Sequence, residues 1–111
     1  MKDCLFCRIV EGHIPSTPVI STDSAVVIRD ISPQAPHHFL VLSREHVESF
    51  HDASPGVIGG VFEAASRLVR REKLDTLGYR VVINVGSGGG QTVPHLHAHV
   101  LAGRQMNWPP G

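Results

Sequence analysis

The sequence predicts an α+β fold in which one long helix packs on an antiparallel sheet. Residues 54–74 carry apolar side chains at helical spacing, which predicts the helix. Short segments rich in β-branched and other apolar residues predict strands at 25–30, 38–43, 79–85 and 95–102. Apart from the one through the long helix, the connections between neighbouring strands are short, and this favours antiparallel pairing.

Length and composition predict one domain, residues 1–111. A chain of 111 residues is close to the commonest domain size, and it shows neither a repeat nor a linker. Ten basic residues balance ten acidic ones, so the basic surplus typical of nucleic-acid binding is missing. No segment approaches the roughly 20 apolar residues of a membrane span, and the charged N-terminal segment does not resemble a secretion signal. We therefore expect a cytoplasmic protein with no nucleic-acid or membrane partner.

The segments before and between the first two predicted strands have less regular structure. Residues 3–10 are predicted to form one or two helical turns, with Asp3 as a possible cap. Turn-forming residues follow at 12–18. The loop between the two strands, 31–36, is interrupted by two prolines.

The long helix has a well-marked start. Ser54 is a good N-cap, and Pro55 suits the first helical position. Gly59 and Gly60 each weaken the helix by about 1 kcal/mol relative to alanine, so we expect close packing there. The apolar stripe consists of Val57, Ile58, Val61, Phe62, Ala65, Leu68 and Val69.

The last predicted strand alternates histidine with apolar residues. Because strand side chains alternate between the two faces, the imidazoles share one face and the apolar residues pack on the core. The histidines are His95, His97 and His99, and the apolar residues are Leu96, Ala98 and Val100. The outer histidines lie roughly 13 Å apart at the strand rise, too far for one metal ion with bonds of about 2 Å. A row of imidazoles suits a phosphate ester instead, and neutral histidine can attack phosphorus.

The loop before this strand, 86–94, supports a phosphate site. Its glycines let backbone amides approach a phosphate closely, and Gln91 and Thr92 add side-chain donors. A glycine-rich loop alone indicates only a turn. Beside the histidines it is a candidate phosphate pocket. The tail after the strand, 103–111, is expected to be irregular.

Several segments resemble one known family. "HLHAHVL" (95–101) has the histidine-triad pattern of alternating histidine and apolar residues. "DISPQAPHHFLVLSREH" (30–46), "GGGQTVPHLHAHVLAGRQMNWPPG" (88–111) and "CLFCRIVEGHIPS" (4–16) are similar to the Hint branch of the histidine-triad nucleotide-binding proteins. The resemblance covers nearly the whole chain. It implies a homodimer with an antiparallel sheet of about five strands, one long helix and a short N-terminal helix.

The resemblance also implies an activity without an organic cofactor. The substrate and partner would be a purine nucleotide. The reaction would be hydrolysis of purine nucleoside 5′-phosphoramidates to a nucleoside 5′-monophosphate and an amine. The middle histidine, His97, would attack the α-phosphorus and form a nucleotidyl-histidine, which water resolves. We expect its ring to stand open to the substrate, with its second nitrogen held by an acceptor.

Further roles follow from the same resemblance. His99 would bond to the phosphate or the bridging atom, and His38 would belong to a relay beside the triad. Asp30 matches the ribose-binding aspartate, since a carboxylate accepts from both hydroxyls of a diol; its alternative is an ordinary turn residue. Thr92 stands where the family commonly has a serine that assists the departing amine. The residues around the phosphate would be Asn84, Gly90, Gln91 and Thr92, and the apolar slot for the base would be Leu5, Phe6, Ile9, Ile28 and Ile31, whose alternative is a place in the core.

The cysteines of "CLFC", Cys4 and Cys7, have three interpretations. A redox pair would normally follow a strand of a βαβ unit, and a disulfide at this spacing is strained. Half of a zinc site is the best option, because zinc takes four soft or borderline ligands and His46 and His95 are candidate partners. The set resembles family members whose zinc is held by two cysteines and two histidines. It implies a structural site.

Two other functions fit the sequence. The chain can be a nucleotide-binding scaffold or regulatory protein whose catalysis is incidental, since a fold does not determine function. A dinucleoside polyphosphate hydrolase has the same triad, but the ending "GRQMNWPPG" argues against that branch. The resemblance places this ending at the dimer interface, where Trp108 would meet the amine side of the substrate.

Overall fold

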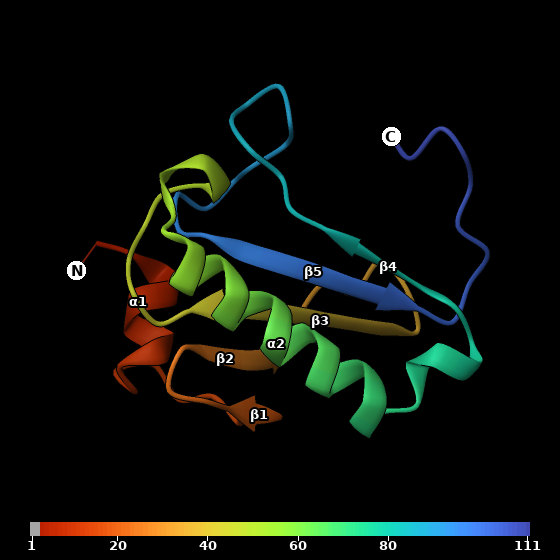
Figure 1. The fold of residues 1–111 in the computed structure, drawn as a ribbon, viewed down its shortest axis with the longest axis horizontal. Coiled ribbons are helices and arrows are strands. Elements are labelled where there is room, and N and C mark those ends of the chain that lie inside the picture. The colour runs from red at the N-terminus through yellow and green to blue at the C-terminus, as the bar shows by residue number, and fades with distance from the viewer. Residues whose placement is uncertain (1–2) are drawn as a thin grey trace.

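The computed structural model describes residues 3–111, which form two α-helices and a five-stranded sheet (Figure 1). The strands lie in the order β1-β2-β3-β5-β4, and each neighbouring pair is antiparallel. The predicted α+β fold is therefore confirmed. The elements are α1 (Leu5–Val10), β1 (Ile20–Ser21), β2 (Ala25–Arg29), β3 (His37–Ser43), a 3₁₀ turn (Phe50–Asp52), α2 (Pro55–Arg71), a second 3₁₀ turn (Leu74–Thr76), β4 (Tyr79–Val82) and β5 (His97–Ala102).

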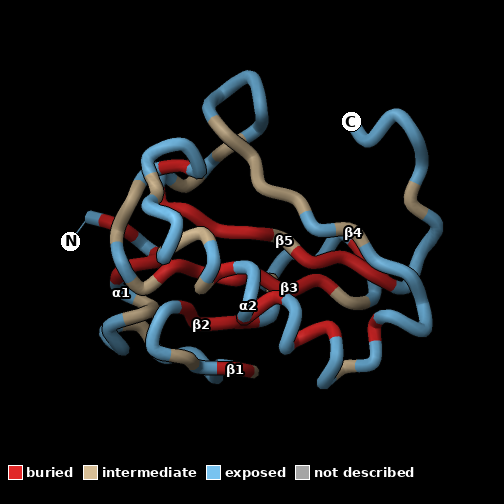
Figure 2. The backbone as a smooth tube through the Cα atoms, in the orientation of Figure 1, coloured by how far each residue is buried: buried red, intermediate tan, exposed pale blue. Residues whose placement is uncertain are grey.

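The two faces of the sheet carry different residues. One face packs on α2 and forms the larger core, with Val27, Phe39, Val41, Leu68, Ala98 and Val100 among its buried residues. The other face packs on α1 in a smaller cluster, with Phe6, Cys7, Val26, Ile28, Leu40 and Leu42. Most residues of β3 and β5, which lie between these two layers, are buried (red in Figure 2). The site lies on the α1 face of this central pair.

Strand β5 separates its histidines from its apolar residues, as the alternation predicts. Ala98 and Val100 belong to the larger core under α2. His97 packs edge to face on Phe6 of α1, with 4.9 Å between the ring centroids. The rings of His97 and His99 lie 5.1 Å apart, centroid to centroid. The imidazoles therefore occupy the α1 face.

Several element boundaries differ from the prediction. Helix α1 is capped by Cys4 and not by Asp3, because the Cys4 sulfur accepts a hydrogen bond from the Cys7 amide at 3.3 Å. Strand β5 begins at His97 and not at residue 95, because Leu96 donates its amide to the Val47 carbonyl at 2.8 Å. Strand β4 ends at residue 82, and the two-residue strand β1 had no predicted counterpart. The late start of β5 leaves His95 outside the sheet.

Helix α2 begins as predicted and ends early. The Ser54 side chain accepts a hydrogen bond from the Val57 amide at 3.2 Å, and Pro55 is the first helical residue. The helix ends at Arg71 and not at residue 74. Lys73, two residues after the helix, takes a left-handed conformation with φ 55°. Phe62, predicted to lie in the apolar stripe, is 43 % exposed, because it lies on the flank of the helix toward β4.

The two adjacent glycines of α2 give a matched prediction. A Cβ atom at Gly60 would lie 2.4 Å from Cβ of Ser24, whereas one at Gly59 would meet nothing within 4 Å. We expect Gly59→Ala to stabilise the protein by up to about 1 kcal/mol, because it removes the cost of a helical glycine. Gly60→Ala should destabilise it by about 1–3 kcal/mol, because the added methyl group is overpacked. Urea unfolding measures both, and equal effects would contradict the close approach at Ser24.

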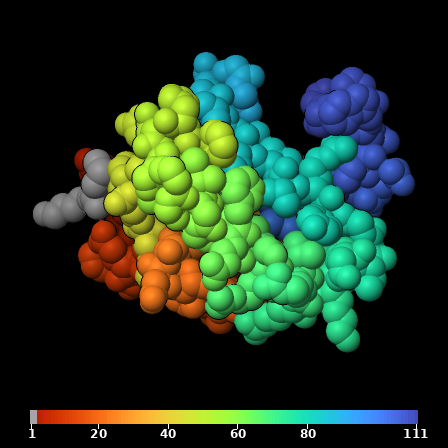
Figure 3. All heavy atoms as spheres, in the orientation of Figure 1, coloured from red at the N-terminus to blue at the C-terminus, as the bar shows by residue number. Residues whose placement is uncertain are grey.

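Outside the sheet, the C-terminal tail projects as an arm (Figure 3, dark blue). Trp108 on this arm is 84 % exposed. Arg80 of β4 holds the arm by donating to the Asn107 carbonyl at 2.9 Å. Within residues 3–111, no helix has both the length and the apolar character that crossing a bilayer requires.

Candidate functional site

A cavity of about 790 Å³ opens on the α1 face of the sheet. Four of its polar lining residues come from three segments: Asp30 after β2, Thr92 in the glycine-rich loop, and His97 and His99 of β5. The other polar and charged lining residues are Ser16, Thr17, Arg29, Arg71 and Glu72. Its apolar wall includes all five residues predicted to hold the base, Leu5, Phe6, Ile9, Ile28 and Ile31. The volume and the lining, apolar with a few converging polar groups, are typical of a small-molecule site.

His97 presents one ring nitrogen to this cavity. Its Nδ1 donates to the His95 carbonyl oxygen at 2.7 Å, so in the neutral ring Nε2 carries the lone pair. The residue is only 5 % exposed, which is less open than expected from the sequence. Nε2 of His97, however, forms no hydrogen bond with any residue that the structure describes. Every fully buried side-chain nitrogen or oxygen of the described residues has a hydrogen-bond partner, so Nε2 is not a buried atom. Nε2 is therefore the accessible atom. Burial lowers the pKa of His97, which favours the neutral ring.

His38 determines which nitrogen of His99 faces the cavity. The Gln34 amide donates to Nδ1 of His38 at 3.0 Å, so the proton of His38 is on Nε2. That proton is donated to Nδ1 of His99 at 2.9 Å. His99 must then carry its own proton on Nε2 and offer a donor to the cavity. The pair His97 and His99 thus combines a nucleophilic lone pair with a hydrogen-bond donor.

The same tautomers argue against a metal ion at this point. Asp30, His38 and His99 have ligand atoms within 4.8 Å of one another. A metal-binding nitrogen needs a free lone pair, but Nε2 of His38 carries a proton because Nδ1 accepts from Gln34. The Asp30 carboxylate lies 3.4 Å from this nitrogen and stabilises the N–H instead. Hydrogen-bonding protons therefore hold these three residues together, and the group matches the relay that the resemblance implies.

The relay gives a prediction for the titration of His99. Burial, and then the neighbouring His97 and His38 rings, lower the pKa of His99 to about 4, although Asp30 acts in the opposite direction. We expect ¹⁵N NMR to show the Nε2–H tautomer of His99 at pH 7 and half-protonation near pH 4. The urea-unfolded chain should titrate near pH 6.5. Since the unfolded state then binds more protons between these values, this residue's contribution to stability falls as the pH drops from 6.5 toward 4. A folded-state midpoint near 6.5 would contradict the relay.

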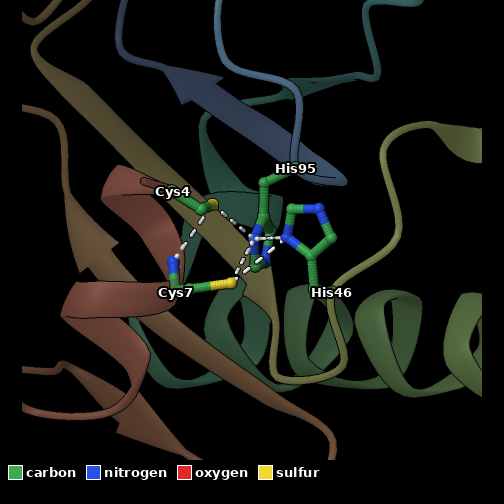
Figure 4. Close-up of side chains that lie close together, drawn as sticks. All are labelled: Cys4, Cys7, His46 and His95. Carbon is green, nitrogen blue, oxygen red and sulfur yellow. Dashed lines mark hydrogen bonds between the residues drawn. The ribbon is translucent and has the colours of Figure 1, made fainter. Parts of the chain in front are cut away.

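A second cluster consists of two cysteines and two histidines (Figure 4), none of which lines the cavity. Cys4 and Cys7 of the α1 segment face His46 and His95. Sγ of Cys4 lies 3.1 Å from Nδ1 of His95, and Sγ of Cys7 lies 3.2 Å from Nδ1 of His46. The two Nδ1 atoms lie 3.3 Å apart. A zinc tetrahedron with bonds of about 2.0–2.3 Å has edges of roughly 3.3–3.8 Å, so the cluster is able to bind zinc with small adjustments.

The hydrogen bonds of His95 support this interpretation. Nε2 of this buried ring donates to the Ser43 carbonyl at 2.6 Å, which leaves the Nδ1 lone pair directed at the cysteines. Metal-binding histidines commonly donate their second N–H to a backbone carbonyl in this way. Burial lowers the pKa of His95 and raises the pKa of the Cys7 thiol. All four ligands predicted from the sequence are therefore brought together.

Three residues predicted at the phosphate do not line the cavity. They are Asn84, Gly90 and Gln91. The Gln91 amide nitrogen donates to the carbonyls of Glu48, at 2.6 Å, and Val93, at 3.1 Å, and its oxygen accepts from the Gly86 amide at 3.0 Å. Gln91 therefore fastens the glycine-rich loop to the body of the protein.

Sequence reasoning also missed parts of the lining. Leu40 and Val93 contribute to the apolar wall, and the connector 14–19 closes one side of it. Leu40 follows the alternation of β3, which could have placed it on the α1 face. The connector carried no signal, because turn-forming residues do not indicate what they lie against.

The fold and the site define a histidine-triad protein: an antiparallel α+β domain whose alternating histidines face a cavity. The model of the HIT domain matches residues 11–106, and the chain belongs to this family. The 14 kDa zinc-binding protein of Brassica juncea is 40 % identical over 114 residues, which cover 98 % of this chain and all of that protein.

Solved structures agree with this assignment. A HIT family hydrolase from Legionella pneumophila is 44 % identical, with a TM-score of 0.92 over 98 % of this chain and 100 % of that one. A histidine triad protein from Clostridium difficile is 36 % identical, with a TM-score of 0.90 over 96 % of both chains. The fold is therefore that of a family which includes hydrolases.

Proposed function

We propose that the protein hydrolyses purine nucleoside 5′-phosphoramidates to a nucleoside 5′-monophosphate and an amine. The observation that carries this proposal is the pairing of a lone pair on Nε2 of His97 with a proton on Nε2 of His99, both at one cavity. A nucleophile beside a donor is what displacement at phosphorus requires. The structure of the Legionella hydrolase, at 44 % identity, supports a hydrolase.

The reaction takes two displacements. In the first, Nε2 of His97 bonds to the α-phosphorus while the P–N bond to the amine breaks. Nε2–H of His99 donates a hydrogen bond to a phosphoryl oxygen, and the departing nitrogen takes its proton from a water molecule, which becomes hydroxide. In the second, that hydroxide bonds to phosphorus and the bond to His97 breaks, which restores the neutral ring. Between the steps His97 is an imidazolium. Thr92 offers a hydroxyl to the phosphate or the amine at the same cavity.

The remaining lining suits the rest of a nucleotide. The apolar wall formed with Leu5, Phe6 and Ile28 suits a flat base. One oxygen of Asp30 accepts from the Ser32 amide at 2.7 Å, which orients the carboxylate at the edge of the cavity. That carboxylate is the acceptor for the ribose hydroxyls.

Three substrates test the proposal. Adenosine 5′-phosphoramidate should be converted to AMP, followed by ³¹P NMR, and diadenosine tetraphosphate should be cleaved much more slowly. Binding of AMP without turnover of either compound would support a scaffold. Preferred cleavage of the dinucleotide would move the protein to the other branch. Uridine 5′-phosphoramidate measures the preference for purines.

We also propose that the Cys4/Cys7/His46/His95 cluster holds a structural zinc ion. The donor set, its distances and the tautomer of His95 support this, as does the name of the Brassica relative. The ion would tie the α1 segment to the loop after β3 and to the segment just before β5. Protein purified without chelator should contain about one equivalent of zinc. Less than a tenth of an equivalent, with both thiols free, would refute the site.

A homodimer completes the proposal. Strand β4 is at the edge of the sheet, and Phe62, Tyr79 and Val81 form an exposed apolar surface between it and α2. A second copy can pair with this edge and cover these side chains. Sedimentation should show a dimer, and Val81→Asp should yield monomers. Phe50→Asp, at a residue that is 40 % exposed against 37 % for Val81, is the matched control and should remain dimeric.

A further inference from the structure

We propose that Arg104, in the C-terminal tail, is a positioning residue for the His38–His99 pair and acts through the backbone of Gln34. The inference rests on the proposed function only for its kinetic readout. Nε of Arg104 donates to the Gln34 carbonyl at 2.8 Å. The amide of the same Gln34 donates to Nδ1 of His38 at 3.0 Å. One residue thus connects the tail to the relay.

Gln34 is an exposed residue whose amide anchors a buried ring. Gln34 is exposed, whereas His38 is only 6 % exposed. The loop 31–36 contains Pro33 and Pro36, which have no amide proton to offer in its place. Within the loop, the Gln34 side chain donates to the Ser32 carbonyl at 3.0 Å. Arg104, which lies outside the loop, fixes the Gln34 backbone by its hydrogen bond.

The backbone brings Arg104 to this position. Gly103 has φ 99°, which disfavours a side chain, and a Cβ atom there would lie 2.9 Å from Cβ of Pro36. The tail therefore crosses the loop in close contact just before Arg104. This close approach is a second contact between the tail and the loop 31–36, and it is independent of the Arg104 hydrogen bond.

The consequence of losing the bond follows from the tautomers. Arginine is always charged, so its bond to the Gln34 carbonyl is charge-assisted and stronger than a neutral one. Without it, the loop can move and the Gln34 amide no longer holds Nδ1 of His38 as an acceptor. His38 can then carry its proton on Nδ1, and its Nε2 accepts from His99. His99 loses its proton on Nε2, which is the donor that faces the cavity.

Arg104→Met tests the proposal, because it keeps most of the apolar stem and removes the donor. Gln105→Ala is the control, since it alters the neighbouring exposed residue of the tail, whose side chain bonds only to the Met106 carbonyl. We expect Arg104→Met to shift the ¹⁵N resonances of His38 and His99 away from the Nε2–H pattern. We expect kcat for the phosphoramidate to fall by about 10-fold with KM within about twofold, as for other lost positioning bonds. Arg104→Lys, which retains a donor, should recover part of both.

The outcomes separate this inference from the proposed function. Wild-type resonances in Arg104→Met would overturn the positioning role, whether or not the protein cleaves phosphoramidates. Equal changes in Gln105→Ala would overturn it too, because they would mean a general effect of the tail. Shifted resonances in a protein without phosphoramidase activity would support the positioning role and contradict only the proposed function. Gly103→Ala, which pushes the tail off Pro36, should shift the same resonances.

Discussion

Replacing His97 with asparagine is expected to lower the rate of phosphoramidate hydrolysis by at least about 10³-fold, because the variant loses the attacking nitrogen and its covalent route. The side chain of asparagine is polar and smaller than imidazole, so the cavity should still bind AMP with a Kd within about tenfold of wild type. Turnover of adenosine 5′-phosphoramidate and calorimetric AMP binding measure the two effects separately.

The covalent intermediate distinguishes a nucleophile from a residue that merely shapes the cavity. Wild-type protein denatured with alkali during turnover, which preserves the acid-labile P–N bond, should gain the mass of one adenylyl group, and His97→Asn should not. His51→Asn is the control, since His51 lies on the 3₁₀ turn before α2 with its side chain 71 % exposed. A His97→Asn variant that keeps more than a tenth of the wild-type rate would exclude His97 as the nucleophile.

Local patterns predicted the parts of the fold that depend on local rules. The alternation of β5 placed His97 opposite Ala98 and Val100, because strand geometry alone separates the faces. Ser54 and Pro55 marked the start of α2, since both act within one helical turn. The boundaries that failed depend on distant partners. Strand β5 starts late because Leu96 bonds to Val47, and nothing near residue 96 indicates that contact.

The same distinction applies to the site. The ligand types and spacing of "CLFC" indicated half a zinc site, and the candidate histidines, His46 and His95, which the resemblance supported, are brought to it by the structure. The side chain of Gln91, which was predicted to lie around the phosphate, bonds to the backbone groups of Glu48 and Val93 in this structure. An amide has the same sequence signal in both roles, so only the fold could separate them. Gln34 and Arg104, 70 residues apart, carried no signal at all.

The Cys4/Cys7/His46/His95 cluster and the proposed nucleophile, His97, are connected through one residue, His95. The ring of His95 belongs to the cluster, and its carbonyl accepts the Nδ1 proton of His97 at 2.7 Å. A metal ion that fixes the His95 ring therefore also fixes the carbonyl that selects the tautomer of the nucleophile. Although the ion would be structural, its loss should lower kcat several-fold as well as the stability.

Cys4→Ser is expected to lower the free energy of unfolding by at least about 3 kcal/mol, because a structural zinc ion contributes its binding energy to folding. For a domain of this size the melting temperature should fall by roughly 10–20 °C. Serine can still cap α1, where the Cys4 sulfur accepts from the Cys7 amide, so the helix start is preserved. Calorimetry with and without added zinc measures the difference.

The metal-free proteins provide the decisive comparison. After chelation, wild type and Cys4→Ser should unfold within about 1 kcal/mol of each other, since both then lack the ion and differ by one buried atom. Restoring zinc should stabilise the wild type alone. If Cys4→Ser were as destabilising without metal as with it, the buried sulfur would stabilise the protein through packing alone. That result would contradict a zinc site at the cluster.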